Sequence, residues 1–300
     1  MPHLAASHPD TPATTPQQTT EDLGAYTPHP PVGQPIDHTA HLSYQPTPQP
    51  GDVALSLRHL VKVFGTLVAV GDLSLDIPTG SFYGIVGPNG AGKTTTLSMA
   101  TGLLIPDQGT ALVHQVDVWQ QPVEAKKLLG IMPDGLRLFT KLSGPDFLTH
   151  VGMLHGLDRQ TARSRTTDLL HTLGLDEAGS KLIADYSAGM VKKVALASAL
   201  IHGPSVIVLD EPFESVDPVS SRHIRSILTD FVQGGGTVVL SSHVMETVEK
   251  LCTHVAVIDH GHVIAAGTTA EVANGIDLDS RFAQLVGGEE EKGGLSWLHS

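Results

Sequence analysis

A glycine-rich stretch in the first third of the chain has the residue types that bind phosphate groups. It contains Gly87, Pro88, Asn89, Gly90, Ala91, Gly92, Lys93, Thr94 and Thr95. These residues match the pattern G-x-x-x-x-G-K-[ST], in which glycines let main-chain N–H groups turn toward an anion. Lys93 can reach the outer phosphates of a nucleotide, and the Thr94 hydroxyl can ligate Mg²⁺. The stretch therefore predicts a site for a nucleoside triphosphate and its magnesium ion.

The segments on both sides of this loop would position it. Residues 81–86 form a short apolar run typical of a buried strand, and residues 95–104 have the composition of a helix. A helix that begins at the loop directs the positive end of its dipole at the bound phosphates. A glycine-rich turn with a chance lysine is the alternative, but it does not account for this strand–loop–helix order.

Two carboxylates follow a second apolar run, at residues 206–209. This run is rich in β-branched residues and too short for a helix, so we expect a buried parallel strand. Asp210 and Glu211 would then lie at the carboxyl end of the sheet, where α/β proteins bind ligands. Asp210 can hold Mg²⁺, and Glu211 can orient or deprotonate an attacking water molecule. For these two residues taken alone, helix capping is the alternative.

A histidine ends a third apolar run, at residues 236–242. His243 would lie at the same edge of the sheet, where its ring can donate a hydrogen bond to a γ-phosphate. A lone histidine is more often a satisfied polar residue than a catalytic one, so the assignment depends on this position. The sequence thus predicts a catalytic set of Lys93, Glu211 and His243.

The composition is that of a soluble globular protein in a reducing compartment. There are 31 acidic and 18 basic residues, and the net charge of -13 disfavours nucleic-acid binding, which depends on phosphate neutralisation by lysine and arginine. Cys252 is the single cysteine in the sequence, and we expect it to be a small buried residue. We expect no secretory signal, because no lysine or arginine precedes Arg58 and the N-terminus has no apolar core segment, and we expect no membrane-spanning run. Action at a membrane would need a second chain.

Composition divides the chain into three parts. Residues 1–50 are rich in proline, threonine, glutamine and histidine, and we expect them to be disordered. Residues 51–275 have the pattern of an α/β domain that starts with an antiparallel β subdomain and carries a helical insertion at about 135–190. Residues 276–300 would form a short C-terminal tail. The predicted fold is therefore a P-loop NTPase core with an N-terminal antiparallel β subdomain and an inserted α-helical subdomain.

A further motif gives a resemblance to a known family. It consists of Tyr186, Ser187, Ala188, Gly189 and Met190. By itself this is an ordinary helix N-cap with a second potential anion site, but it is similar to L-S-G-G-Q, the signature motif of ATP-binding cassette (ABC) proteins. With the phosphate loop, the acidic strand end and the histidine in that order, residues 53–267 resemble the nucleotide-binding subunit of ABC transporters. The resemblance implies that Ser187 and Gly189 face the γ-phosphate of ATP held by a second copy.

The resemblance also assigns roles to single residues. Phe64 matches the aromatic residue that stacks on adenine, although it could also pack in the core. Glu211 matches the general base and His243 the switch histidine, which implies a working hydrolase. Two cofactors are implied. ATP would be held by residues 87–95, and Mg²⁺ would be held by Thr94, Asp134 and Asp210.

Two positions depart from the family pattern. The family has glutamine where this chain has Asp134, in a loop that senses the membrane partner. Aspartate can still ligate Mg²⁺, but it adds a negative charge and is one methylene shorter, so we expect nucleotide binding to be kept. Met190 replaces the glutamine of the signature motif, whose phosphate-contacting positions Ser187 and Gly189 are present.

The implied function is that of an ATP-hydrolysing subunit that energises a separate membrane permease. Its partners would be a second copy and the integral membrane permease, and it would lie in the cytoplasm on the inner face of the membrane. The helical insertion would meet the permease. The form of residues 186–190 and the short C-terminal tail are similar to drug- and polymer-export subunits, which favours export.

Three alternatives belong to other classes. A soluble ABC ATPase acting on ribosomes or DNA normally has two cassettes or a long coiled coil, and this chain has one cassette and an acidic balance. Another P-loop enzyme, such as a GTPase or a small-molecule kinase, has no reason to carry the motif at residues 186–190. A non-catalytic ATP-binding regulatory module would show no turnover, so replacement of Glu211 by glutamine distinguishes it from a hydrolase.

Overall fold

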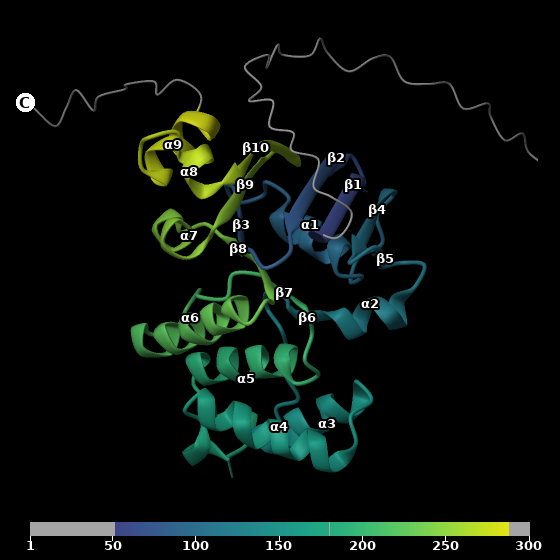
Figure 1. The fold of residues 1–300 in the computed structure, drawn as a ribbon, viewed down its shortest axis with the longest axis vertical. Coiled ribbons are helices and arrows are strands. Elements are labelled where there is room, and N and C mark those ends of the chain that lie inside the picture. The colour runs from purple at the N-terminus through teal and green to yellow at the C-terminus, as the bar shows by residue number, and fades with distance from the viewer. Residues whose placement is uncertain (1–51, 180, 288–300) are drawn as a thin grey trace, which may run out of the picture. The chain divides into compact units, whose positions relative to one another are not determined.

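The structure is a computed structural model that describes residues 52–179 and 181–287. The expected disordered segment at residues 1–50 lies outside the described residues. The described part contains two β-sheets, and the helices of residues 144–200 are grouped at one end of the domain (Figure 1).

The first sheet has four antiparallel strands and forms the expected antiparallel β subdomain. Its strands are β1 (Val53–Phe64), β2 (Leu67–Pro78), β4 (Gln108–Val113) and β5 (Val116–Asp117). Their order across the sheet is β2-β1-β4-β5. The hairpin of β1 and β2 pairs Val53 with Pro78 at one end and Phe64 with Leu67 at the other. Phe64 therefore lies at the tip of the hairpin.

The second sheet has six strands in the order β10-β9-β3-β8-β7-β6. Their bounds are Phe82–Val86 for β3, Leu129–Met132 for β6, Val206–Leu209 for β7, Thr237–Ser242 for β8, His254–Asp259 for β9 and His262–Thr268 for β10. All neighbouring strands are parallel except β10, which runs antiparallel to β9. The three apolar runs noted in the sequence are thus β3, β7 and β8, and β8 lies between the other two. Their carboxyl ends meet at one edge of the sheet.

Nine helices are described. They are α1 (Lys93–Ala100), α2 (Pro122–Leu128), α3 (Gly144–Leu154), α4 (Arg159–Thr172), α5 (Ala188–Leu200), α6 (Pro218–Gln233), α7 (Met245–Leu251), α8 (Thr269–Ala273) and α9 (Leu278–Val286). The helix expected after the phosphate loop is α1, which begins two residues earlier than predicted and ends at Ala100. The helical insertion contains α3, α4 and two short 3₁₀ turns, Asp176–Ala178 and Ile183–Asp185.

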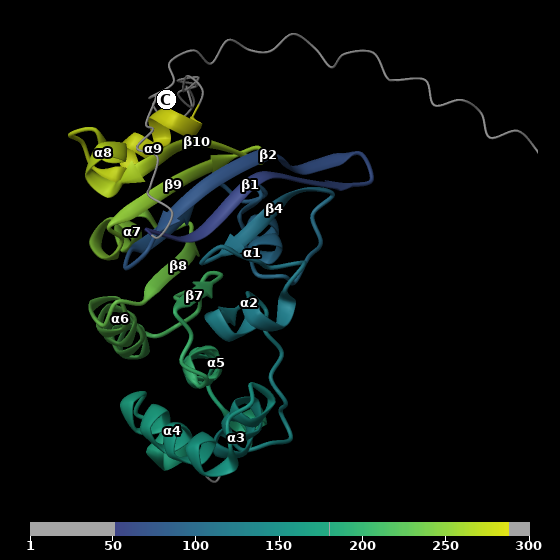
Figure 2. The ribbon, with the colours of Figure 1, turned by 45° about the vertical axis from the view of Figure 1, so that its right-hand side comes forward.

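Helix α5 connects the helical insertion to the second sheet. It packs against α3 and α4 on one side and against α6 and β6 on the other (Figure 2). Because α5 begins at the residues of the predicted signature motif, a movement of the insertion relative to the sheet would also move that motif.

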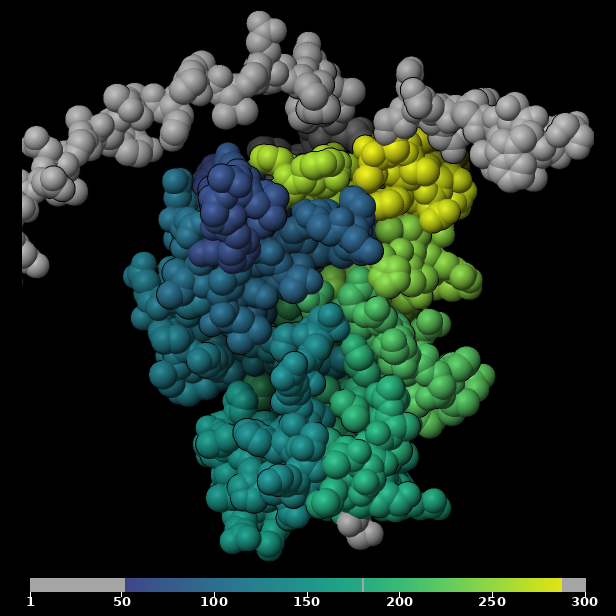
Figure 3. Space-filling view, turned by 180° about the vertical axis from the view of Figure 1, so that it is seen from behind, coloured from purple at the N-terminus to yellow at the C-terminus, as the bar shows by residue number. Residues whose placement is uncertain are grey.

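The two sheets meet along strands β2 and β10, which contact each other (Figure 3). The amide of Gly71 in β2 donates to the carbonyl oxygen of Gly261, next to β10. The phosphate loop follows β3, which lies in the second sheet, whereas the tip of the β1–β2 hairpin belongs to the first sheet. A ligand held by both must therefore lie between the two sheets.

Successive residues of β3 point into two separate cores. Phe82 and Val86 belong to the core on the helical side, and Tyr83 and Ile85 belong to the core shared with the first sheet and α1. Every residue of β3, β7 and β8 is buried, as expected for parallel strands covered on both faces. Cys252 is buried as expected, and burial raises the pKa of its thiol to about 12.

The expected C-terminal tail is in part a packed helix. Helix α9 places Leu278, which is fully buried, in the core on the helical side, and Phe282 packs against the same core. The apolar residues of this segment recur at helical spacing, and this pattern explains why it folds onto the domain. Residues 288–300 lie outside the described part.

Candidate functional site

Two glycines of the phosphate loop, Gly87 and Gly92, lie so close to other main-chain atoms that a side chain there would clash. Gly92, the N-cap of α1, has a φ of 101°, and a Cβ atom there would lie 2.5 Å from the carbonyl oxygen of Ala69. A Cβ atom at Gly87 would lie 2.2 Å from the carbonyl oxygen of Ile258. The loop is thus pressed against β2 and β9, while Asn89 at its tip stays exposed.

Lys93 folds back over this loop. Its Nζ atom is buried and donates to the carbonyl oxygens of Gly87 at 2.8 Å and Pro88 at 3.1 Å. Burial lowers the pKa of the Lys93 ammonium below its ordinary value, although the nearby carboxylates of Glu211 and Asp210 act in the opposite direction. A phosphate in the loop would offer this ammonium a charged acceptor, which binds it more strongly than neutral carbonyl groups do.

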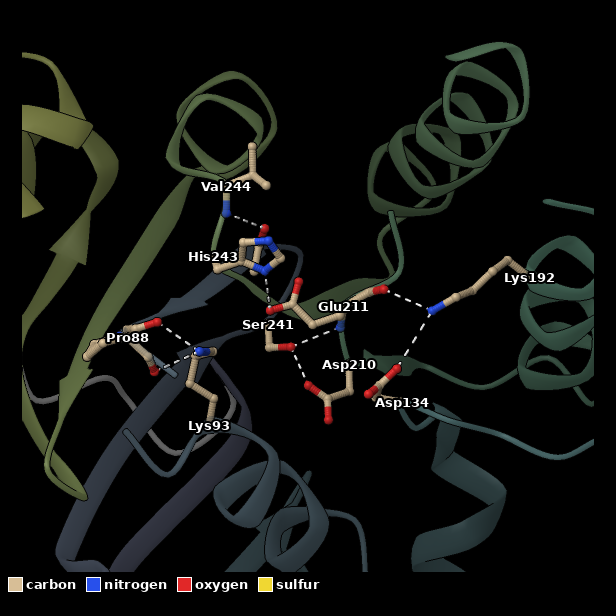
Figure 4. A network of polar contacts seen from close by, with 11 residues as sticks. Pro88, Lys93, Asp134, Lys192, Asp210, Glu211, Ser241, His243 and Val244 are labelled. Atoms are coloured by element: carbon tan, nitrogen blue, oxygen red, sulfur yellow. Dashed lines mark hydrogen bonds and ion pairs between the residues drawn. The ribbon is translucent and has the colours of Figure 1, made fainter. Parts of the chain in front are cut away.

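The acidic end of β7 is fixed by a serine of the neighbouring strand. Asp210 is buried, and its Oδ1 atom accepts a short hydrogen bond from the hydroxyl of Ser241 in β8 (Figure 4). The main-chain N–H of Glu211 donates to the same hydroxyl oxygen at 2.9 Å. Ser241 therefore holds the carboxylate of Asp210 and the main chain of Glu211. The sequence analysis did not identify it, because the contact joins residues 31 positions apart on strands whose adjacency a single sequence does not show.

Glu211 and His243 face each other across the ends of β7 and β8. The Nδ1 atom of His243 lies 3.0 Å from the Oε1 atom of Glu211. The Glu211 side chain is 16% exposed and the His243 side chain 50%. The predicted base and the predicted histidine are thus in direct contact at the sheet edge (Figure 4).

A cavity of about 610 Å³ gathers most of the predicted site residues. Those that line it are Phe64, Asn89, Gly90, Ala91, Gly92, Lys93, Thr94, Thr95, Asp134, Glu211 and His243. Gly87 and Pro88 adjoin it through their bonds to Lys93, and Asp210 adjoins it beneath Glu211. The prediction missed Leu67, Ala69 and Glu214, which also line the cavity. Leu67 and Ala69 were predictable in part, since both follow Phe64 on the hairpin.

Phe64 lies at the rim of this cavity and not in either core. It is 49% exposed, and the Nζ atom of Lys62 lies 5.7 Å from the centre of its ring. Of the two options left open by the sequence, core packing is therefore wrong. The exposed ring face can stack on a base.

The oxygen donors around the cavity fit a magnesium ion that is shared with a nucleotide. Thr94 is exposed and lines the cavity together with Asp134, and the buried Asp210 directly precedes the cavity residue Glu211. In residues 52–179 and 181–287 there is no group of three or more His, Cys, Asp or Glu side chains arranged to hold a metal. Magnesium usually takes one or two carboxylates and completes its shell with water and phosphate oxygens, so this sparse set suits it.

The predicted signature motif lies outside this cavity. Ser187 is the N-cap of α5, and its hydroxyl accepts from the main-chain N–H of Met190 at 3.3 Å. Gly189 is buried against α6, where a Cβ atom would lie 2.8 Å from Oδ2 of Asp217 and 2.9 Å from Oγ of Ser220. The structure thus brings together the phosphate loop, the carboxylates and His243, but it does not bring Ser187 and Gly189 to the same cavity.

Comparison with known proteins identifies the family. Residues 70–214 match the family model described as ABC transporter. The chain is 33% identical over 237 residues to the linearmycin resistance ATP-binding protein LnrL of Bacillus subtilis, over 79% of this chain and 76% of that protein. The chain belongs to the ATP-binding subunits of ABC transporters. Another such subunit, the daunorubicin/doxorubicin resistance ATP-binding protein DrrA of Streptomyces peucetius, is 37% identical over 223 residues, 74% of this chain and 68% of that protein.

Solved structures agree with this assignment. The structure of an ATP-binding subunit of an ABC transporter superposes with a TM-score of 0.73 at 25% identity, over 77% of this chain and 99% of that chain. A dimeric ATP-binding cassette bound to ADP and phosphate has the same fold, with a TM-score of 0.66 at 21% identity over 71% of this chain and 98% of that chain. The predicted fold and family are confirmed, and the chain is an ABC ATPase. No helix in its described part is long and apolar enough to cross a bilayer.

Proposed function

We propose that this ABC ATPase works as a pair of copies that enclose ATP and energise export through a separate membrane permease. One observation carries the proposal. The cavity at the carboxyl ends of β3, β8 and β7 contains the glycine-rich loop and the Glu211 carboxylate, whereas Ser187 and Gly189 lie outside it. A second copy would supply the groups that each cavity lacks.

Within one copy, each residue has a role that follows from its position. Lys93 and the loop N–H groups stabilise the charge of the β- and γ-phosphates. Glu211 lies at the cavity wall, where its carboxylate can take the proton of the attacking water. His243 can turn from Glu211 toward the γ-phosphate and donate a hydrogen bond there. Thr94, Asp210 and Asp134 would hold Mg²⁺, which neutralises phosphate charge when bound.

The second copy would present the start of α5 to the nucleotide. Ser187 is exposed, and α5 has 13 residues, so its N–H groups and dipole favour an anion at this end. The solved cassette that is bound to ADP and phosphate is a dimer, which supports this arrangement.

The names of the relatives support export. LnrL is named for resistance to linearmycin, and DrrA for resistance to daunorubicin and doxorubicin. The Nod factor export ATP-binding protein I of Cupriavidus metallidurans is 33% identical over 237 residues, 79% of this chain and 78% of that protein. A chain of this kind would be held at the inner face of the membrane by its permease. The permease would select the substrate.

ATP-driven dimerisation tests this proposal. The Glu211→Gln variant keeps its shape but loses the base, so we expect it to bind ATP without turnover and to run as a dimer in light scattering with MgATP. Adding Ser187→Arg, which puts a bulky cation at the proposed interface, should return it to a monomer with its ATP affinity kept. Glu214→Gln, which changes another carboxylate at the cavity wall, is the matched control and should retain turnover. A Glu211→Gln chain that stays monomeric at saturating MgATP would contradict the paired arrangement.

A further inference from the structure

Lys192 lies where three segments of the catalytic end of the sheet come together. It is in the second turn of α5, and its side chain is 20% exposed. Its Nζ atom donates to the main-chain carbonyl oxygen of Glu211 at 3.0 Å and lies 4.0 Å from Oδ1 of Asp134 (Figure 4). The ammonium group of Lys192 therefore joins helix α5 to the loop after β7 and to the loop after β6.

The main chain at Glu211 needs such support. Its φ of 46° is in the left-handed region, which a long side chain rarely adopts. Its N–H donates to Ser241 and its carbonyl oxygen accepts from Lys192, so side chains of two other elements fix both polar groups of this residue. A residue with a strained main chain persists only when its surroundings hold it in that conformation. In this chain the strained residue is Glu211, the proposed base.

The carboxylate of Asp134 is the negatively charged neighbour of the Lys192 ammonium group. It lines the nucleotide cavity, and together with Lys192 it also lines a smaller cavity of about 240 Å³ between the loop after β6 and α5. Its carboxylate supplies a negative charge to Lys192 at a position where glutamine would supply none. The charge pair is partly screened because half of the Asp134 side chain is exposed, so the hydrogen bond to Glu211 is the stronger contact.

We propose that Lys192 is a positioning residue for ATP hydrolysis. It holds the carbonyl group of Glu211 so that the carboxylate stays at the cavity wall, and through Asp134 it ties this geometry to the loop after β6. A shift of α5 would then move the base directly. This inference rests on the proposed role of Glu211 as the general base.

The test is a comparison of turnover and nucleotide affinity. Lys192→Met removes both contacts, and we expect kcat to fall by about 10-fold to 100-fold, as for a small misplacement of a reacting group. The affinity for the fluorescent analogue TNP-ATP and the KM for ATP should stay unchanged, since Lys192 does not line the nucleotide cavity. Lys192→Arg, which can donate to the carbonyl and pair with Asp134, should restore most of kcat. Lys127→Met, which removes an exposed lysine of α2, is the matched control and should match the wild type.

Several outcomes would overturn the positioning role. Wild-type kcat in Lys192→Met would do so, as would an equal loss of TNP-ATP affinity or a failure of arginine to rescue. If Lys192→Met does not fold, Lys192→Ser is assayed instead, because its side chain is too short to reach the carbonyl oxygen of Glu211, and wild-type kcat in that variant would also overturn the proposal. Glu211→Gln is assayed alongside. If it loses turnover while Lys192→Met does not, the positioning role alone fails, and if it keeps turnover, the proposed base and this inference both fail.

Discussion

The Nδ1 atom of His243 lies 3.0 Å from the Oε1 atom of Glu211, across the adjacent strand ends of β8 and β7. Both side chains line the cavity that also contains Lys93. The histidine side chain is half-exposed, whereas the main-chain N–H and carbonyl groups of Glu211 are both hydrogen-bonded to other side chains. The contact therefore joins a half-exposed ring to the carboxylate of a residue whose main chain is held on both sides, and a γ-phosphate would compete with this carboxylate for the histidine.

Replacement of His243 by alanine should slow hydrolysis without weakening nucleotide binding. We expect kcat to fall by about 100-fold, the effect of removing one preorganised donor to a developing charge. His243→Gln keeps a donor at a similar distance and should lose less. Phosphate release and TNP-ATP binding measure the two effects separately, and an alanine variant with wild-type kcat would refute a role for this ring.

A methyl group at Gly189 should disturb the start of α5. In Gly189→Ala the new Cβ atom would lie 2.8 Å from Oδ2 of Asp217 and 2.9 Å from Oγ of Ser220, so α5 and α6 must move apart. We expect a lower Tm and a weaker MgATP-dependent dimer. Gly179→Ala is the matched control, because its φ is -56° and its closest neighbour would be 3.4 Å away. Equal dimerisation of both variants and the wild type would contradict the proposed contact.

His202 should make stability depend on pH at the junction of α5 and β6. Its ring stacks on His155 at 3.8 Å, and its Nε2 atom is 3.0 Å from the carbonyl oxygen of Leu129. Burial, together with the nearby His155 and Arg165, lowers the pKa of His202 to about 4, although the hydrogen bond to Leu129 acts in the opposite direction. Burial, with a smaller contribution from Lys126, also lowers the pKa of His155. In the unfolded chain this histidine is protonated below about pH 6.5, whereas in the folded chain it stays neutral down to about pH 4. Its contribution to the free energy of unfolding is therefore fully present above about pH 6.5 and is lost as the pH falls toward 4.

The measurement for His202 is the urea unfolding midpoint at pH 7 and pH 5. The midpoint of the wild type should fall on acidification. His202→Phe keeps a ring in the stack but cannot titrate, so its midpoint should change less. The same change in both proteins would show that the acid sensitivity lies elsewhere.

The local parts of the fold could be predicted from the sequence, and the long-range parts could not. The strand–loop–helix order around Lys93 and the carboxylates after residues 206–209 depend on neighbours in the chain, and the predicted fold and family are confirmed. Helix α6 was missed although Asp217 and Pro218 form an N-cap with proline at the first helical position. This helix start signal was present in the sequence, but the sequence analysis did not use it.

The full length of strands β1 and β2 could not be predicted from the sequence, because it depends on contacts between the two strands. The alternation of apolar residues lapses at His59 and at Asp72, yet both strands continue through these positions. Both residues have positive φ angles, 51° and 58°, where the pairing shifts in register, and their side chains lie 2.7 Å apart. A β-bulge inserts an extra residue without ending the strand, so a strand can continue where the alternation of apolar residues is interrupted. In the same way, the contacts of Ser241 and Lys192 join segments whose proximity only the folded chain shows.

The central claim is that the loop around Lys93 binds the phosphates of ATP. Calorimetric titration of the purified chain with ATP in the presence of Mg²⁺ tests it most directly, with Lys93→Ala beside the wild type and Lys127→Ala as the control. We predict saturable binding by the wild type and the control, and an affinity about 10-fold to 100-fold lower for Lys93→Ala, the effect of losing a charged hydrogen bond. Absence of binding by the folded wild type, or equal affinity in Lys93→Ala, would contradict the account.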